Sequence, residues 1–341
     1  MAPSDISSLP ILGAGAYGSV HLWTAIDGTR LAVKQLHPHL ARDPEVVRRF
    51  LQEATVMKRL NGQGVPAVSE VVQRPDATFF AMEYFELGSL QDAITRRGDR
   101  PFPPAEAKSI ANGICKAMQS AHAQKIVHRD LKPSNILFRA SAPVKERPEL
   151  NQPIITDFGL ARILETRADL STVSAGTIAY MAPEQEDGRA TLASDIFALG
   201  VIIYQLYSGR LPYSPGQQSK KRQGVYPAMS SAAPVHIIEI VRRALSPNPL
   251  ERPSLAELTS ALTISPLSPA HATPAVQVIR DTRVETSGSN PWLAFAGVGL
   301  IVWAIFAGIF IDEGLDNDSA LALALIPAAI AAAIAGYFAD N

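Results

Sequence analysis

Apolar and polar residues alternate near the start of the chain in short runs that are typical of β-strands. Residues 20–26 (VHLWTAI) largely alternate in this way, and Asp27 and Gly28 follow them as a turn pair. This order predicts a β-hairpin, whose second strand contains the run LAVK at residues 31–34. Residues 79–85 (FFAMEYF) form another apolar run and predict a further buried strand.

A helix is predicted between these strand regions. Asp43 is a favourable N-cap, Pro44 suits the first helical position, and Glu45 places a negative charge in the first turn. Glu53 lies beside the apolar face of this helix, so its carboxylate can point inward. Helical spacing predicts that this buried face contains Phe50, Ala54 and Met57.

Two long uncharged runs, residues 292–311 and 320–339, stand near the end of the chain. At a rise of about 1.5 Å per residue, each spans roughly 30 Å, the thickness of the hydrocarbon layer of a bilayer. They predict two transmembrane helices joined by a short acidic loop, residues 312–319, and preceded by a Pro/Ser/Thr-rich linker, residues 263–291. The second run is rich in alanine and contains Pro327, so an interfacial or buried helix is its alternative.

The charges around these runs predict their orientation. Arg280 and Arg283 precede the first run, whereas the loop between the two runs contains no Lys or Arg. Basic residues favour the cytosolic side, so we expect a helical hairpin with Met1 and Asn341 in the cytosol and Glu313 outside. The N-terminal arm, residues 1–8, lacks the basic and apolar regions of a signal peptide.

The charge balance and the cysteine content each bear on the class of protein. The 341 residues include 31 Lys and Arg against 32 Asp and Glu, a net charge of −1 that gives no reason to expect a nucleic-acid partner. The single cysteine, Cys115, excludes an intrachain disulfide framework and suits a reducing cytosol.

Two short polar segments carry the candidate chemistry. Residues 128–135 (HRDLKPSN) place a carboxylate, an ammonium group and a carboxamide in one loop, and Asp157 begins the triplet DFG. Phosphoryl transfer from ATP needs this inventory: a base for the substrate hydroxyl, a cation for the moving phosphoryl group, and oxygen ligands for Mg²⁺. The two segments therefore predict a phosphotransferase.

A glycine-rich segment near the N-terminus supplies a candidate phosphate-binding loop. Residues 13–20 (GAGAYGSV) fit the pattern G-x-G-x-x-G-x-V, which alone also occurs in dinucleotide-binding sites. A dinucleotide site would open a helix after its glycines, whereas here a strand follows. The glycines would let the hairpin approach the ATP phosphates closely.

Together these motifs resemble the eukaryotic-type (Hanks-type) serine/threonine protein kinases, in particular bacterial membrane-anchored members. The resemblance implies an α+β, bilobal kinase fold over residues 9–262, with a small β-rich N-terminal lobe containing one helix and a larger helical C-terminal lobe. It also implies transfer of the γ-phosphate of ATP to Ser/Thr hydroxyls of proteins, with Mg²⁺ or Mn²⁺. We further expect the protein to phosphorylate itself, with a homodimer performing this reaction in trans. The kinase domain is expected to lie in the cytosol and to be attached to the inner (cytoplasmic) membrane.

The resemblance assigns roles in the loop after residue 127. Asp130 is expected to be the catalytic base and Lys132 to stabilise the γ-phosphate. Asn135 and Asp157 are expected to bind the metal ion. Lys132 at this position, and the segment at residues 176–184 (GTIAYMAPE), are typical of Ser/Thr rather than Tyr kinases.

Nucleotide binding is assigned to the glycine-rich loop, the second strand and the strand at residues 79–85. Lys34 is expected to contact the α- and β-phosphates and to pair with Glu53, while Met82 is the gatekeeper that precedes the hinge. The expected ATP-binding residues are Leu12, Gly13, Ala14, Gly15, Ala16, Tyr17, Gly18, Val20, Ala32, Lys34, Met82, Glu83, Phe85 and Leu137.

Other residues are expected to support or regulate the site. The activation segment is the stretch after the DFG triplet that contains the candidate phosphorylation sites. Arg129 and Arg162 lie where a phosphate on this segment would bind. The candidate phosphorylation sites are Ser171, Thr172, Ser174 and Thr177. The expected structural residues are His128, Phe158, Glu184, Asp195 and Arg252, the last pairing with Glu184.

Two features depart from the family pattern, and two other functions are alternatives to a protein kinase. A polar extension at residues 139–152 lengthens the separation of Asp130 and Asp157, and the eight residues between the predicted spans leave no room for an extracellular sensor. A pseudokinase would have lost Lys34, Asp130, Asn135 or Asp157, and none of them is lost. A small-molecule phosphotransferase on the same fold would generally lack the segment at residues 176–184.

Overall fold

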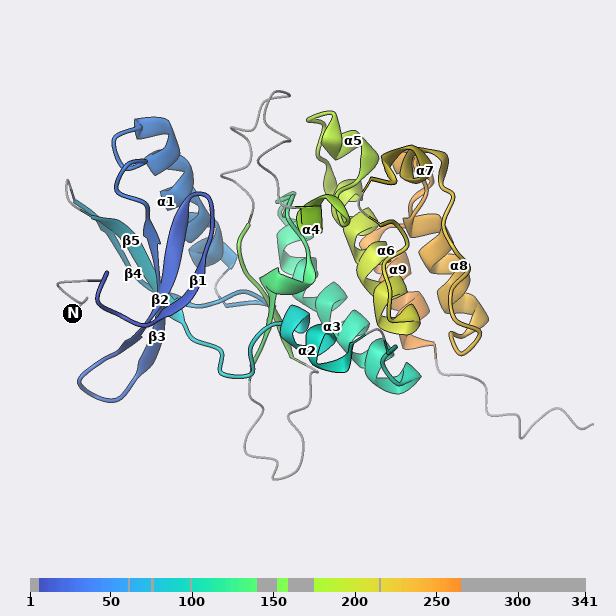
Figure 1. Ribbon diagram of the computed structural model, residues 1–341, viewed down its shortest axis with the longest axis horizontal. Helices are drawn as coiled ribbons and strands as arrows, with labels where there is room; N and C mark the ends of the chain where they lie inside the picture. Colours follow the sequence, from blue (N-terminus) through green and yellow to red (C-terminus); the bar gives the residue numbers. More distant parts are fainter. Residues whose placement is uncertain are drawn as a thin grey trace, which may run out of the picture. The chain divides into compact units, whose positions relative to one another are not determined.

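The computed structural model describes residues 6–60, 62–74, 77–98, 100–139, 152–158, 175–214 and 216–264 (Figure 1). They all belong to one compact unit, residues 1–267. Both predicted membrane spans, the loop between them and the linker beyond residue 264 lie outside the described residues. Within the described ranges, no helix is both long and apolar enough to cross a membrane.

The N-terminal lobe is a five-stranded antiparallel sheet in the order β1-β2-β3-β5-β4 (Figure 1). The predicted hairpin forms, but its first strand ends at Thr24 rather than at Ile26. The amide of Ala25 already bonds the carbonyl of Thr29, so the turn begins earlier and leaves Ile26 fully exposed. The strands are β1 Ile11–Ala14, β2 Gly18–Thr24, β3 Arg30–Leu36, β4 Val68–Gln73 and β5 Thr78–Glu83.

Helix α1 (Pro44–Leu60) packs against one face of this sheet. It begins where the sequence predicts, because the Asp43 carboxylate accepts a hydrogen bond from the Glu45 amide at 2.8 Å. The predicted buried stripe is confirmed: Phe50, Ala54 and Met57 are at most 3% exposed. Ile6, from the N-terminal arm, packs against the core cluster formed by Val33, Phe79 and Ala81.

Gly18 is required by the close pairing of β2 and β3. It lies opposite Leu36, and a Cβ atom at this position would come 2.1 Å from the carbonyl oxygen of Gln35. No L-residue with a side chain fits there without moving the strands. The last glycine of the glycine-rich loop thus has a packing reason in addition to any role with phosphates.

The C-terminal lobe is helical, with α3 at its centre in contact with α6, α9 and β7. Helix α9 starts with a capping box formed by Ser254 and Glu257, and α6 is buried along nearly its whole length. The longer helices are α2 Leu90–Arg97, α3 Pro104–Ala123, α6 Leu192–Ser208, α8 Val235–Ala244 and α9 Leu255–Thr263. The short elements are η1 Pro133–Asn135, β6 Ile136–Phe138, β7 Pro153–Ile155, α4 Ala175–Ile178, α5 Pro183–Glu186, α7 Gln218–Gln223 and η4 Pro249–Glu251.

Two large clusters form the core. One lies between α1 and the sheet and also includes Ala121 of α3 and Phe158, and a larger one fills the helical lobe around α3 and α6. The predicted α+β fold, with a β-sheet lobe followed by a helical lobe, is therefore confirmed.

Candidate active site

A two-stranded sheet brings the two polar segments of the candidate site together. β6 follows the loop at residues 128–135, and β7 precedes Asp157; the strands pair antiparallel with Ile136 opposite Ile155. The amide of Thr156 also donates to the carbonyl of Asn135 at 3.0 Å. Asn135 and Asp157 therefore lie at the same end of this sheet.

Asp130, Lys132 and Asn135 meet through their side chains. The Lys132 ammonium lies 2.9 Å from Asp130 Oδ2, and the Asn135 carboxamide donates to the same oxygen at 3.2 Å. Asn135 also donates to the Asp130 carbonyl at 2.8 Å, and Lys132 donates to the Thr177 hydroxyl at 3.0 Å. A carboxylate, an ammonium, a carboxamide and the Thr177 hydroxyl thus stand within one hydrogen-bonded group.

The backbone of this loop is held by Asp195, a buried residue of α6. Its carboxylate accepts hydrogen bonds from the amides of His128 at 2.9 Å and Arg129 at 3.0 Å, and from the His122 ring at 2.9 Å. Arg129 has a φ of 71°, a left-handed conformation that a residue with a side chain adopts at a cost. The Asp195 contacts offset that cost directly before Asp130.

His128 is buried and uses both of its ring nitrogens. Nε2–H donates to the Thr156 carbonyl at 3.0 Å, and Nδ1 accepts from the Asp130 amide at 3.2 Å. Its ring centroid lies 4.7 Å from that of Phe158. Burial lowers the pKa of His128 and favours the neutral ring that these contacts require. The imidazole therefore orients the loop and is not placed for proton transfer.

Lys34 lies between two carboxylates. Its ammonium is 2.8 Å and 3.0 Å from the two oxygens of Glu53 on α1, and 2.6 Å from Asp157 Oδ1. These contacts join the sheet, the helix of the N-terminal lobe and the DFG segment. Asp157 has a φ of 58°, another left-handed residue at this point.

Burial and charge shift the pKa values of this group in different directions. Burial raises the pKa of Glu53 to about 7; the Lys34 ammonium opposes this, and the Asp157 charge adds to it. Burial alone would raise the pKa of Asp157 too, but Lys34 holds it below its usual value. The two carboxylates raise the pKa of Lys34 in spite of its burial. Lys34 is therefore fully charged at neutral pH.

The residues expected to bind ATP lie mainly on β1, β2, β3 and β5 of the N-terminal sheet and on β6 of the two-stranded sheet. In the glycine-rich loop, the Gly15 amide bonds the Gly18 carbonyl at 2.8 Å, and His37 donates to the Gly15 carbonyl at 2.9 Å. Met82, the last buried residue of β5, is 4% exposed and pairs with Ala32 of β3. Of the others, Leu12, Gly13 and Ala14 lie on β1, Val20 on β2 and Leu137 on β6, while Tyr17 packs against the cluster around α1.

Arg139 contacts the candidate site, although no pattern in the sequence indicates this. The guanidinium of Arg139 donates to both oxygens of Glu83, at 3.0 Å and 2.7 Å, and lies 5.8 Å from the centre of the Phe85 ring. Glu83 and Phe85 are the two ends of the expected hinge. The bond from His122 to Asp195 is not indicated by the sequence either. Both contacts join residues more than 50 positions apart in the chain, so no local pattern could have indicated them.

Glu184 and Arg252 form a buried bidentate pair, with distances of 2.7 Å and 2.8 Å. Ser194 donates to the same carboxylate at 2.7 Å. Burial would raise the pKa of Glu184, but the guanidinium holds it below its ordinary value. This pair anchors the segment that begins at Thr177 to the helical lobe.

Three candidate phosphorylation sites, Ser171, Thr172 and Ser174, lie outside the described residues, as do Arg162 and the larger part of the 139–152 extension. Thr177 is described and buried, and its hydroxyl accepts the hydrogen bond from Lys132. The four hydroxyls stay candidates from sequence.

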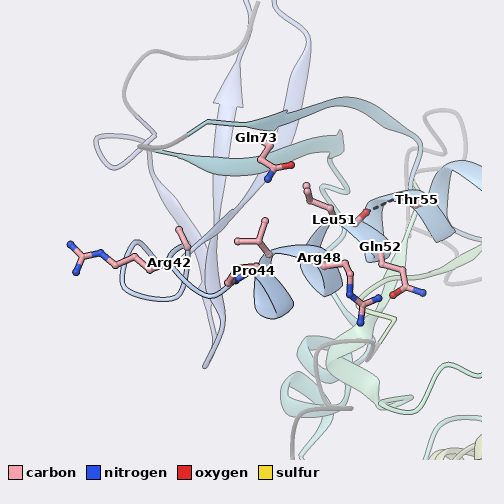
Figure 2. A pocket seen from close by; sticks show the side chains of 9 residues that line it. Arg42, Pro44, Arg48, Leu51, Gln52, Thr55 and Gln73 are labelled. Atoms are coloured by element: carbon pink, nitrogen blue, oxygen red, sulfur yellow. Dashed lines mark hydrogen bonds between the residues drawn. The ribbon is translucent and has the colours of Figure 1, made fainter.

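A separate hollow of about 610 Å³ lies on the outer side of α1 (Figure 2). Its lining includes Arg42, Arg48, Gln52 and, from β4, Gln73. None of the residues assigned to catalysis or nucleotide binding lines it. The helix thus presents Glu53 to the candidate site and a different face, which includes Val47 and Leu51 as well as polar residues, to this hollow.

Comparisons with known proteins agree with this geometry. Residues 6–262 match the model of the protein kinase domain. The chain is 34% identical to the serine/threonine-protein kinase Pkn1 of Myxococcus xanthus over 272 residues, which cover 74% of this chain and 37% of that protein. It is 33% identical to the serine/threonine-protein kinase PrkC of Bacillus subtilis over 260 residues, which cover 73% of this chain and 38% of that protein.

The matched region spans less than half the length of these curated relatives. A third relative, the serine/threonine-protein kinase PkaA of Streptomyces coelicolor, is 31% identical over 272 residues, 74% of this chain and 48% of its own length. The chain therefore belongs to the protein kinase family, among the bacterial kinases of the eukaryotic serine/threonine type.

Proposed function

We propose that the chain is an ATP-dependent protein serine/threonine kinase, which transfers the γ-phosphate of ATP to Ser or Thr hydroxyls of proteins. One observation carries this proposal: Asp130, Lys132 and Asn135 share hydrogen bonds in the loop before β6. The charged group of Lys34, Glu53 and Asp157 complements it. The family generally uses ATP and Mg²⁺ and acts on protein substrates.

Each group has a role that its chemistry supports. Asp130 accepts the proton of the attacking hydroxyl, and Lys132 offsets negative charge on the transferred phosphoryl group. Lys34 binds the α- and β-phosphates and is oriented by Glu53. Catalysis then rests on positioning and on fixed charges, as phosphoryl transfer requires.

The residues at the metal position fit Mg²⁺. Asn135 donates its amide hydrogens to Asp130, and its carboxamide oxygen accepts from the Ser134 hydroxyl at 3.3 Å, which leaves that oxygen capacity for a metal ion; Asp157 contributes a carboxylate. Hard oxygen ligands of this kind are what Mg²⁺ and Mn²⁺ prefer. When bound, the ion would neutralise charge on the β- and γ-phosphates.

Lys34→Met is expected to lower phosphoryl transfer roughly 10²- to 10³-fold, because a fixed charge at the phosphates is removed. The measurement is incorporation of ³²P from [γ-³²P]ATP and Mg²⁺ into casein, a generic phosphoacceptor protein. Lys58→Met, which removes an exposed lysine from the last turn of α1, is the matched control and should retain activity. Equal labelling by wild-type and Lys34→Met proteins would refute the assignment of Lys34.

The two alternatives make different predictions in the same assay. A pseudokinase would transfer phosphate to no acceptor. The presence of Lys34, Asp130, Asn135 and Asp157 argues against this alternative. A small-molecule phosphotransferase would consume ATP without labelling protein. The pairing of Thr177 with Lys132 favours a protein substrate, because it joins residues 176–184, which resemble the substrate-docking stretch of Ser/Thr kinases, to the loop at residues 128–135.

We further propose that residues 292–311 and 320–339 anchor the kinase domain, residues 9–262, to the cytoplasmic membrane as a helical hairpin. The support is their length, their lack of charge and the distribution of Arg around them. Autophosphorylation on the activation segment by a homodimer is part of the same proposal, with Arg129 and Arg162 as phosphate-binding cations.

In intact cells, a Glu313→Cys variant in a Cys115→Ser background is expected to react with a membrane-impermeant thiol reagent, because the loop at residues 312–319 should face outward. An Asn341→Cys variant in the same background is the control and should react only after lysis. The hairpin is wrong if Glu313→Cys stays unlabelled until lysis while Asn341→Cys is labelled from outside.

A further inference from the structure

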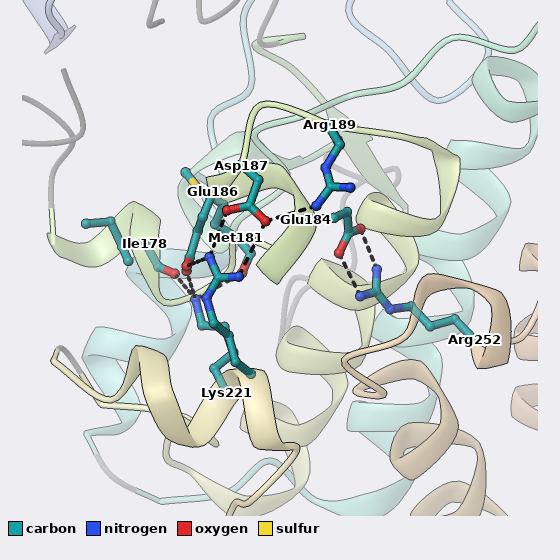
Figure 3. A network of polar contacts seen from close by, with 9 residues as sticks. Ile178, Met181, Glu184, Glu186, Asp187, Arg189, Lys221 and Arg252 are labelled. Atoms are coloured by element: carbon teal, nitrogen blue, oxygen red, sulfur yellow. Dashed lines mark hydrogen bonds and ion pairs between the residues drawn. The ribbon is translucent and has the colours of Figure 1, made fainter. Parts of the chain in front are cut away.

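Lys221 is a buried lysine outside the catalytic group. It lies on α7 in the run Lys220-Lys221-Arg222, which resembles a solvated basic segment. Lys220 and Arg222 are indeed exposed, whereas the Lys221 side chain is 2% exposed. Figure 3 shows it pointing from α7 toward Ile178, Met181 and Glu186.

The Lys221 ammonium has three acceptors, one for each of its hydrogens. It donates to the carbonyl of Ile178 at 2.8 Å, to the carbonyl of Met181 at 3.0 Å and to Glu186 Oε1 at 2.8 Å. Glu186, on α5, is itself nearly buried and also contacts Arg222 at 3.3 Å. The buried charge is thus paired and fully hydrogen-bonded.

The carbonyls of Ile178 and Met181 belong to the segment from Thr177 to Glu184. This segment contacts the loop at residues 128–135 at one end and Arg252 at the other. Thr177, at its start, bonds Lys132, and Glu184, at its end, is held by Arg252. Lys221 fastens the residues between these two points (Figure 3). The segment is therefore held at its start, in its middle and at its end by side chains from three different parts of the chain.

A buried ammonium needs a reason, because it loses its hydration. Burial lowers the pKa of Lys221, with Glu186 acting in the opposite direction. An apolar side chain could fill the same space on α7 without this cost. What an apolar side chain cannot do is donate to the carbonyls of Ile178 and Met181, which fixes the backbone conformation there.

We propose that Lys221 is a positioning residue for the protein substrate: it holds the carbonyls of Ile178 and Met181 and thereby shapes the surface on which the substrate chain docks beside Asp130. This inference rests on the proposed function. It concerns recognition of the protein substrate and assigns Lys221 no contact with ATP.

The test compares Lys221→Met with Arg222→Met, which removes a cation from the neighbouring position without touching the two carbonyls. For Lys221→Met, we expect the KM for casein to rise about tenfold or more, since the buried Met181 carbonyl loses the Lys221 donor and the Ile178 carbonyl keeps the longer bond from the Met181 amide at 3.3 Å. The KM for ATP should change much less. Arg222→Met should keep both KM values near those of the wild type.

The double variant Lys221→Met/Glu186→Leu covers the case in which the single variant does not fold, because it leaves no unpaired carboxylate behind. A raised KM for casein in either folded variant supports the proposal. The proposal is overturned if the KM for casein is unchanged, or if the KM values for casein and ATP rise together. Absence of casein labelling by the wild-type protein would instead overturn the proposed function.

Discussion

Asp130→Asn is expected to slow phosphoryl transfer to protein hydroxyls by roughly 10²- to 10⁴-fold, because asparagine keeps the shape of the side chain but cannot accept a proton. The group around it also depends on its charge, since Lys132 lies 2.9 Å from Asp130 Oδ2. The measurement is the steady-state rate of casein phosphorylation at saturating ATP and Mg²⁺.

The control for this variant is Asp27→Asn, the same chemical change in the exposed turn between β2 and β3. Asp27 accepts a hydrogen bond from the Thr29 amide and is far in the chain from the catalytic loop. This variant should keep the wild-type rate. If Asp130→Asn also keeps it, Asp130 is not the base, and the role assigned to the loop fails.

Arg252→Met is expected to lower the free energy of unfolding by about 3–5 kcal/mol, since it leaves the Glu184 carboxylate buried and without its cation. The side chains of Arg252 and Glu184 are 0% and 9% exposed. Arg252 also donates to the carbonyls of Ser246 and Ala193, which would lose their donor. Urea unfolding followed by fluorescence measures the change.

Arg242→Met is the matched control, because Arg242 pairs with Glu239 on the exposed side of α8. Exposed pairs one turn apart contribute only about 0.2–0.5 kcal/mol. Should the two variants be destabilised to the same small extent, the buried pair does not anchor the segment between Thr177 and Glu184 in the way inferred here.

Much of the fold and the candidate site could be predicted because the relevant residues are contiguous. The helical stripe of Phe50, Ala54 and Met57 and the cap at Asp43 are local patterns, and both are present. The contacts among Asp130, Lys132 and Asn135 could also be predicted, because the three residues lie in one short loop that keeps their side chains close together.

Contacts between distant parts of the chain could not be predicted in the same way. Arg139 reaches Glu83 across 56 positions, and Lys221 reaches Met181 across 40. Because Lys221 is flanked by exposed basic residues, the local sequence pattern does not indicate that its side chain is buried. The early end of β2 has a similar origin, since the Ala25–Thr29 bond decides it rather than the alternation through Ile26.

Phosphorylation of Ser and Thr side chains with ATP is measured directly by mass spectrometry of casein and of the protein itself, after incubation of the full chain, in detergent or lipid vesicles, with Mg²⁺ and ATP. We predict phosphate on serine and threonine residues, dependent on Mg²⁺ and lost in Asp130→Asn. Phosphate confined to tyrosine, or no protein-bound phosphate in the folded wild-type protein, would contradict the account.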